Sequence, residues 1–197
     1  MLNGHTEIVA IIDKSGSMSK LTDDTIGGFN EFLKSQKSVK GTADITLVLF
    51  ATGVEYIYNK VPLNNCKDLD KTNYVADGDS TALLDAIGSV IDTVGKRLSE
   101  TEEHLRPEKV MVCILTDGLE NHSHKFSNNQ IREKIEHQRT NYKWEFVFMG
   151  ANQDSFLTAG NIGISKQYTS NFIADSVGTK AAYSDMSRMT ASYRSNS

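Results

Sequence analysis

Oxygen-bearing side chains follow directly on an apolar run near the start of the chain. Residues 8–19 read IVAIIDKSGSMS, so the carboxylate of Asp13 is followed by the hydroxyls of Ser15 and Ser17, with Gly16 between them. These donor atoms are all hard oxygens, which suit Mg²⁺ or Mn²⁺ better than zinc or copper. This turn is therefore a candidate for holding a magnesium or manganese ion.

A second carboxylate, Asp117, ends another apolar run at residues 109–117 (KVMVCILTD), and Thr81 lies just before a long helical pattern. In parallel α/β sheets, ligands collect beyond the carboxyl ends of the strands, where the strand order reverses. If the two strands are neighbours there, Asp13 and Asp117 repel each other unless a proton or a cation lies between them. The arrangement predicts a divalent-ion site formed by two carboxylates and three hydroxyls: Asp13, Ser15, Ser17, Thr81 and Asp117.

The positions of these side chains depend on strands that the hydropathy pattern predicts. Residues 54–59 alternate in the manner of an antiparallel edge strand, and a weak strand is expected near residues 168–169. Continuous apolar runs indicate four strands buried on both faces, as in a parallel sheet covered by helices: residues 8–12, 44–50, 109–117 and 144–149.

Helical patterns fill the segments between these strands. The clearest is a stripe of apolar residues, spaced three or four apart, that runs from Leu84 to Leu98 and ends near residue 99. Ser127 and Gln130 have capping-box spacing and begin a helix to about residue 141. Other helices are predicted over residues 25–39 after caps at Asp23 and Asp24, around Leu69, to residue 161 after a cap at Asp154, and over residues 176–193.

The alternation of strands and helices predicts an α/β fold. We expect three layers in a doubly wound, Rossmann-like arrangement, with a mainly parallel six-stranded sheet and one antiparallel edge strand. The 197 residues suffice for one domain with a sizeable core. In that domain, residues 6–150 form the core, and residues 151–197 supply the C-terminal helices and the last strand.

Composition argues against several classes of function. The 21 Lys and Arg residues against 25 Asp and Glu residues leave a net charge of −4, which does not favour nucleic acid as a partner. The longest apolar runs are too short to span a bilayer, and the polar N-terminus has no signal-peptide pattern. The two cysteines, Cys66 and Cys113, give no disulfide framework. We therefore expect a cytoplasmic protein that does not bind membranes.

Three short motifs resemble those of von Willebrand factor A domains. Residues 13–17 (DKSGS) resemble the D-x-S-x-S signature of that family, and residues 116–118 (TDG) resemble its later T-D-G motif. Residues 78–81 (GDST) resemble the segment that carries the metal-binding threonine. The motifs occur in the family's order, and the resemblance extends from residue 7 to about residue 149. It is strongest to the small, free-standing microbial members.

The resemblance implies an intact metal-ion-dependent adhesion site and no enzymatic activity. In that site the hydroxyls of Ser15, Ser17 and Thr81 touch Mg²⁺ or Mn²⁺, while the carboxylates of Asp13 and Asp117 bind it directly or through water. One coordination position stays open for an Asp or Glu of a partner protein, so the ion mediates a protein–protein contact. Candidates for the rim of the site, or for contacts to its ligands, are Gly16, Asp79, Gly118, Glu120, Asn121 and Asn152.

Each candidate residue also has a structural interpretation. Ser15 and Ser17 can be turn residues that bond to their own backbone, and Thr81 can be a helix N-cap. Asp13 and Asp117 can be helix caps or solvated strand ends. His122 and His124 suggest zinc, but no third nitrogen or sulfur ligand lies at a usable spacing.

The competing function is a metal-dependent phosphotransferase or hydrolase that uses Asp13 as its nucleophile. Aspartyl phosphatases of the haloacid type require a second Asp two positions on, where this chain has Ser15. No P-loop or G-x-S-x-G motif is present either. A dinucleotide-binding fold fails because the first turn carries hydroxyls and an acid where a pyrophosphate needs bare glycine backbone.

Overall fold

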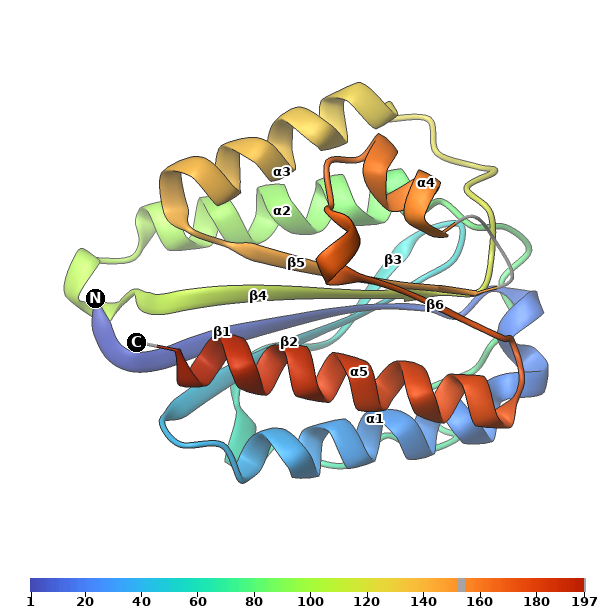
Figure 1. Cartoon of the computed structure of the whole chain (residues 1–197), viewed down its shortest axis with the longest axis horizontal. Coiled ribbons are helices and arrows are strands. Elements are labelled where there is room, and N and C mark those ends of the chain that lie inside the picture. The colour runs from blue at the N-terminus through green and yellow to red at the C-terminus, as the bar shows by residue number, and fades with distance from the viewer. Residues whose placement is uncertain (152–154, 197) are drawn as a thin grey trace.

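The computed structural model describes residues 1–151 and 155–196 (Figure 1). Six strands form one sheet: β1 (Leu2–Asp13), β2 (Thr42–Phe50), β3 (Val54–Pro62), β4 (Pro107–Thr116), β5 (Glu145–Ala151) and β6 (Thr169–Phe172). Their order is β3-β2-β1-β4-β5-β6. The edge strand β3 is antiparallel to β2, and all other neighbours are parallel. The predicted six-stranded sheet with one antiparallel edge is confirmed.

Helices cover both faces of this sheet: α1 (Thr22–Lys37), α2 (Leu83–Glu100), α3 (Asn128–Tyr142), α4 (Ser155–Asn161) and α5 (Ser176–Ser195). Figure 1 shows α1 and α5 on one face and α2, α3 and α4 on the other. Alternate residues of β1 pack in opposite directions, with Ile8 and Ile12 in the α1–α5 layer and Val9 and Ile11 in the α2–α3 layer. Burial on both faces explains the continuous apolar run of this strand.

The strand order reverses between β1 and β4. The chain passes from β1 to β2 on one side and later enters β4 on the other side of β1. Ile12 of β1 is opposite Leu115 of β4, so these two parallel strands end at the same edge of the sheet. Asp13 and Asp117 therefore follow the carboxyl ends of adjacent strands at the position where open α/β sheets bind ligands.

One acidic side chain lies in the central strand. Glu7 of β1 is only 1% exposed, and its carboxylate receives two hydrogen bonds from the guanidinium of Arg97 in α2. The hydroxyl of Thr46 in β2 donates a third bond to Glu7 Oε1 at 3.1 Å. A buried charge is tolerated only when it is paired in this way, so Glu7 joins the sheet to α2.

Two local predictions were wrong. The segment around Leu69 is not helical, because the Asn30 side chain bonds both the carbonyl (2.9 Å) and the amide (2.8 Å) of Leu69. Asp23 and Asp24 do not precede α1 but lie in its first turn, since the 3₁₀ helix Gly16–Leu21 continues directly into α1. The predicted cap Asp154 lies outside the described residues.

The remaining helices agree with the sequence patterns. The capping box of α3 is present, with Gln130 N donating to Ser127 Oγ and Ser127 N donating to Gln130 Oε1. Asp175 caps α5 by accepting a bond from the amide of Gly178 at 2.7 Å. None of the helices in the described part of the chain has both the length and the apolar character that crossing a bilayer requires.

Candidate metal site

Asp13 is the last residue of β1 and is fully buried. Its Oδ1 accepts a hydrogen bond from the Ser15 amide at 2.7 Å, and its Oδ2 accepts one from the Thr116 hydroxyl at 2.6 Å. The Tyr74 hydroxyl donates to the carbonyl oxygen of Asp13 at 2.8 Å. Both the side chain and the backbone of Asp13 are therefore held in one position.

The Ser15 and Ser17 hydroxyls connect the first turn to the end of β4. Ser15 Oγ lies 3.0 Å from Ser17 Oγ, and Ser17 Oγ donates to Asp117 Oδ1 at 2.6 Å. The Ser15 side chain also hydrogen-bonds to the Asp13 carboxyl, so these hydroxyl bonds go to other side chains. A purely local turn role therefore does not account for them.

Burial raises the pKa of both carboxyls in the absence of a cation. For Asp13, burial has the largest effect, hydrogen bonds from Thr116 and Ser15 oppose it, and the charge of Asp117 raises the pKa further. For Asp117, burial likewise raises the pKa and the bond from Ser17 lowers it. A bound cation would favour the ionised form of both groups.

The Thr81 side chain lies at the same place. Thr81 is 3% exposed, and its hydroxyl lies 2.8 Å from the point where a Cβ on Gly118 would stand. Asp13 Oδ2 lies 3.5 Å from that same point. Hence Thr81, Asp13 and the turn after β4 meet there, and only glycine leaves the space between them open.

Thr81 is not the N-cap of α2, as the structural interpretation supposed. The N-cap residue is Ala82, and its side chain makes no capping bond. Instead, the amides of Leu84 and Asp85 donate to Glu120 Oε2 (2.8 Å) and Ser123 Oγ (3.0 Å) of the loop that follows β4. The loop therefore accepts the hydrogen bonds of the free backbone amides at the start of α2. The Thr81 hydroxyl is not needed to cap this helix.

Backbone hydrogen bonds connect the two loops that carry the hydroxyls. Ser15 and Gly78 form an isolated parallel bridge, in which Gly16 N donates to Gly78 O (2.7 Å) and Gly78 N donates to Lys14 O (3.2 Å). A Cβ on Gly78 would lie 2.2 Å from the Cβ of Ala51, so a side chain does not fit there. The first turn and the segment before Thr81 are thus one backbone unit.

The candidate rim residues differ in their surroundings. Asp79 is exposed, and the amide of Gly16 belongs to the loop bridge. The Glu120 carboxylate accepts bonds from the amides of Leu84, His122 and Ser123, so it organises the loop and the start of α2. Asn152 lies outside the described residues, so its predicted place at the rim stays a prediction.

Sequence reasoning missed the supporting roles of two residues, Thr116 and Tyr74, and named a third, Asn121, only as a candidate for the rim. Thr116 lies within the T-D-G motif, but nothing local indicates that its hydroxyl bonds to Asp13. Asn121 accepts a bond from Thr81 N (2.9 Å) and donates its own amide to Thr81 O (3.1 Å). Tyr74 belongs to a polar segment without periodicity, which gave no signal that its side chain is buried beneath Asp13.

The two histidines after β4 do not build a zinc site. The rings of His122 and His124 touch edge to face, with centroids 4.8 Å apart. Within residues 1–151 and 155–196, no three His, Cys, Asp or Glu side chains gather where they could hold a metal ion. The candidate site relies instead on two carboxylates and three hydroxyls, a hard-oxygen donor set that fits Mg²⁺ or Mn²⁺.

Sequence comparison finds no relatives: no protein-family model matches the chain, and no curated protein does. Solved structures do match in fold. Proximal thread matrix protein 1 from the mussel byssus has a TM-score of 0.66 at 15% identity, covering 95% of this chain. A von Willebrand factor type A protein from Catenulispora acidiphila scores 0.56 at 16% identity and 93% coverage, and the pilus adhesin SpaC of Lactobacillus rhamnosus GG scores 0.68 at 12% and 94%.

This chain spans less than half of each of these chains: 46%, 42% and 30% respectively. Identities this low establish the fold alone, which is that of von Willebrand factor A structures. One structure of the mussel protein is described as having a zinc-occupied MIDAS motif, the metal-ion-dependent adhesion site. That statement concerns the mussel protein.

Proposed function

We propose that this chain is a Mg²⁺- or Mn²⁺-dependent protein–protein interaction module without enzymatic activity. Five residues would hold the ion: Asp13, Ser15, Ser17, Thr81 and Asp117. When bound, the ion supplies an electrophilic centre that an Asp or Glu of a partner protein can approach, because three of its protein ligands are neutral hydroxyls. We also place the protein in the cytoplasm, since Cys66 and Cys113 are free and buried.

The observation that carries this proposal is the convergence of three separate segments at the β1–β4 switch point. Ser17 is bonded to Asp117, one hundred residues away in the chain. The Thr81 hydroxyl and Asp13 Oδ2 both lie within 3.5 Å of the Cβ position of Gly118. Two carboxyls whose pKa values are raised by burial, with hydroxyl oxygens between them, form a cluster that a divalent ion would stabilise.

Exposed apolar side chains at the same edge of the sheet support a protein partner. Six large apolar residues are exposed in the segments at this edge. Val54 starts β3, Val75 precedes the Gly78 bridge, and Leu119 and Ile173 follow β4 and β6. Phe156 and Val177 lie in the first turns of α4 and α5. Apolar side chains exposed at the edge that carries the candidate site offer surface that a protein partner can bury.

The burial of Asp13 argues against the competing hydrolase. A nucleophilic carboxylate needs an oxygen that can reach the substrate. Asp13 is fully buried, and both of its oxygens accept short hydrogen bonds from Ser15 and Thr116. These contacts suit a residue that positions other groups or holds a cation.

Calorimetry with the full chain tests the metal site. Titration with Mg²⁺ or Mn²⁺ should give saturable binding that is lost in Asp13→Ala and weakened in Thr81→Ala, with the circular dichroism spectrum unchanged. Asp77→Ala removes an exposed carboxylate of the neighbouring loop and should bind as the unmodified chain does. Equal binding by Asp13→Ala would overturn the proposal, and parallel titrations with Zn²⁺ and Ca²⁺ test the choice of metal.

A capture experiment tests the interaction. The immobilised chain is exposed to an extract with Mg²⁺ or with a chelator, and the Asp13→Ala variant serves as the matched control. We expect a partner that binds only with Mg²⁺ and only to the unmodified chain. The partner's contact residue is then found by replacing each of its Asp and Glu residues by Asn or Gln. Partners that bind Asp13→Ala equally well would contradict a metal-mediated contact.

A further inference from the structure

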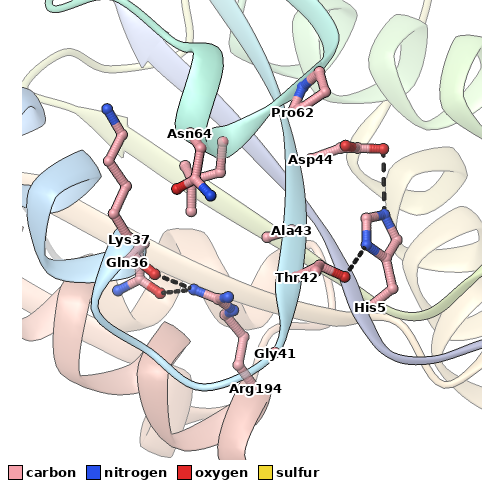
Figure 2. A pocket seen from close by; sticks show the side chains of 11 residues that line it. His5, Gln36, Lys37, Gly41, Thr42, Ala43, Asp44, Pro62, Asn64 and Arg194 are labelled. Atoms are coloured by element: carbon pink, nitrogen blue, oxygen red, sulfur yellow. Dashed lines mark hydrogen bonds and ion pairs between the residues drawn. The ribbon is translucent and has the colours of Figure 1, made fainter.

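A cavity of about 210 Å³ lies at the opposite edge of the sheet from the candidate metal site. It is bounded by the end of α1, the start of β2, the end of β3 and the last turns of α5 (Figure 2). Its walls combine charged residues with an apolar side formed by Ala43, Pro62 and Leu63. The cavity is smaller than the roughly 300–1,000 Å³ pockets of drug-sized ligands, so it has room for a smaller molecule.

Arg194 is the decisive residue of this cavity. It is only 8% exposed, and its guanidinium donates from one terminal nitrogen to the backbone carbonyl (2.6 Å) and the side-chain carbonyl (3.2 Å) of Gln36 (Figure 2). Its Nε is buried and has no hydrogen-bond partner among the described residues. No described acidic side chain forms an ion pair with it. A buried charge without a counter-charge is costly.

The acidic residue that lines the cavity is already paired. Asp44 Oδ2 lies 3.2 Å from His5 Nε2, and His5 Nδ1 lies 2.8 Å from Thr42 Oγ1 (Figure 2). The second permanent cation, Lys37, donates to the carbonyl oxygen of Cys66 at 3.1 Å and has no acidic partner among the described residues. The cavity is therefore lined by two cations, Arg194 and Lys37, and by one carboxylate, Asp44, which leaves positive charge in excess.

We propose that this cavity binds a small organic carboxylate. The guanidinium of Arg194 matches a carboxylate in charge, and because Gln36 holds one terminal nitrogen and Nε is buried, the other terminal nitrogen is the donor for the ligand. The apolar wall of Ala43, Pro62 and Leu63 would contact the hydrocarbon part of the ligand. Because Gln36 and Lys37 end α1, the negative end of that helix dipole also faces the site and offsets part of its positive charge, for a carboxylate as for a phosphate. The proposal does not depend on the metal site.

The experiment uses the full chain passed over a chelating resin, so that a carboxylate finds no ion at the metal site. Butyrate is titrated while the backbone amide signals of Lys37, Thr42 and Ala43 are followed by NMR. Butyramide, which has the same shape without the charge, is the control ligand. We expect saturable shifts with butyrate and none with butyramide. Equal shifts with both ligands, or no saturable shift with butyrate, would overturn the proposal.

Variants locate the binding. Arg194→Met should weaken butyrate binding by about tenfold or more, and Arg194→Lys should weaken it less, because lysine keeps the charge but not the guanidinium group. Asn64 is an exposed residue that lines the cavity, so Asn64→Trp should fill part of it and weaken butyrate binding. Asn65 is exposed but does not line the cavity, so Asn65→Trp is the control. These two substitutions keep the test valid if the Arg194 variants unfold. Unchanged binding in folded Arg194→Met, or saturation by phosphate instead of butyrate, would contradict the assignment.

Discussion

Thr116 and Asp13, the last residues of two adjacent parallel strands, are joined by a hydrogen bond of 2.6 Å between Oγ1 and Oδ2. Thr116 Oγ1 also accepts a bond from the amide of Gly118 at 3.1 Å. One hydroxyl therefore positions both the buried carboxylate and the turn that carries Asp117. The candidate site depends on a residue that does not itself need to touch the ion.

Thr116→Val should weaken Mg²⁺ binding by about tenfold or more, because outer contacts that orient a metal ligand typically contribute this much. Thr116→Ser, which keeps the hydroxyl, should bind nearly as well as the unmodified chain. Calorimetric titration of both variants provides the measurement. Equal affinities for the valine and serine variants would show that the Asp13 carboxylate keeps its orientation without this bond.

Gly118→Ala should impair metal binding without unfolding the chain. The added methyl group would lie 2.8 Å from the Thr81 hydroxyl, closer than side-chain atoms normally approach, so Thr81 must move. We expect a loss of affinity on the order of tenfold. Gly27→Ala on α1 is the control, since a Cβ there meets nothing within 4 Å. If Gly118→Ala binds Mg²⁺ normally, the Thr81 hydroxyl is not a ligand.

The ionisation of Asp85 should make the stability of the folded chain depend on pH. Burial alone would raise the pKa of its carboxyl, but hydrogen bonds from the amides of His124, Lys125 and Phe126 lower it below the usual 3.8. The folded state therefore favours the ionised form, which adds stability above about pH 3.8, and this stability is lost as the pH falls through the lowered pKa.

Asp85→Asn should accordingly lower the thermal midpoint at pH 7, and its difference from the unmodified chain should shrink as the pH drops below 3.8. Melting curves of both proteins across this range are the measurement. Asp79→Asn, an exposed carboxyl for which no hydrogen bond to the described residues is found, is the matched control. A difference that grows in acid would mean that the amides of the loop do not stabilise the charge.

The ion pair of Glu7 and Arg97 should stabilise the fold. A double variant can show whether the cost of losing Arg97 comes from the buried charge of Glu7. Arg97→Met leaves the Glu7 carboxylate buried without a counter-charge, which costs about 3–5 kcal/mol in comparable cases. Adding Glu7→Gln removes the charge and keeps an acceptor for Thr46, so the double variant should be more stable than Arg97→Met alone. Urea unfolding of the three proteins measures this. A less stable double variant would contradict a charge-based cost.

The strands could be predicted from sequence because burial on both faces leaves an unbroken apolar run. β4, which lies between β1 and β5, is the clearest case. Asp13, Ser15 and Ser17 could be found because they share one local motif at the end of such a run. Thr81 could be named from its position just before the long helical pattern, but only the tertiary fold brings it to Gly118.

Residues 63–78 could not be predicted because distant side chains, and not local periodicity, satisfy their backbone. Asn30 bonds both polar groups of Leu69, the Tyr58 hydroxyl donates to Lys67 O, and Lys37 donates to Cys66 O. Contacts between residues this far apart in the chain occur at no fixed separation, so a sequence pattern does not reveal them. The same reason concealed the bond between Thr116 and Asp13.

The bridge between Ser15 and Gly78 has a consequence for protein engineering. Because main-chain atoms make its hydrogen bonds, the geometry of the two loops does not depend on the neighbouring exposed side chains. Asp77 and Asp79 flank the bridge on the surface. These two positions should tolerate randomisation, so a library there could redirect the choice of partner while the chelating oxygens keep their places.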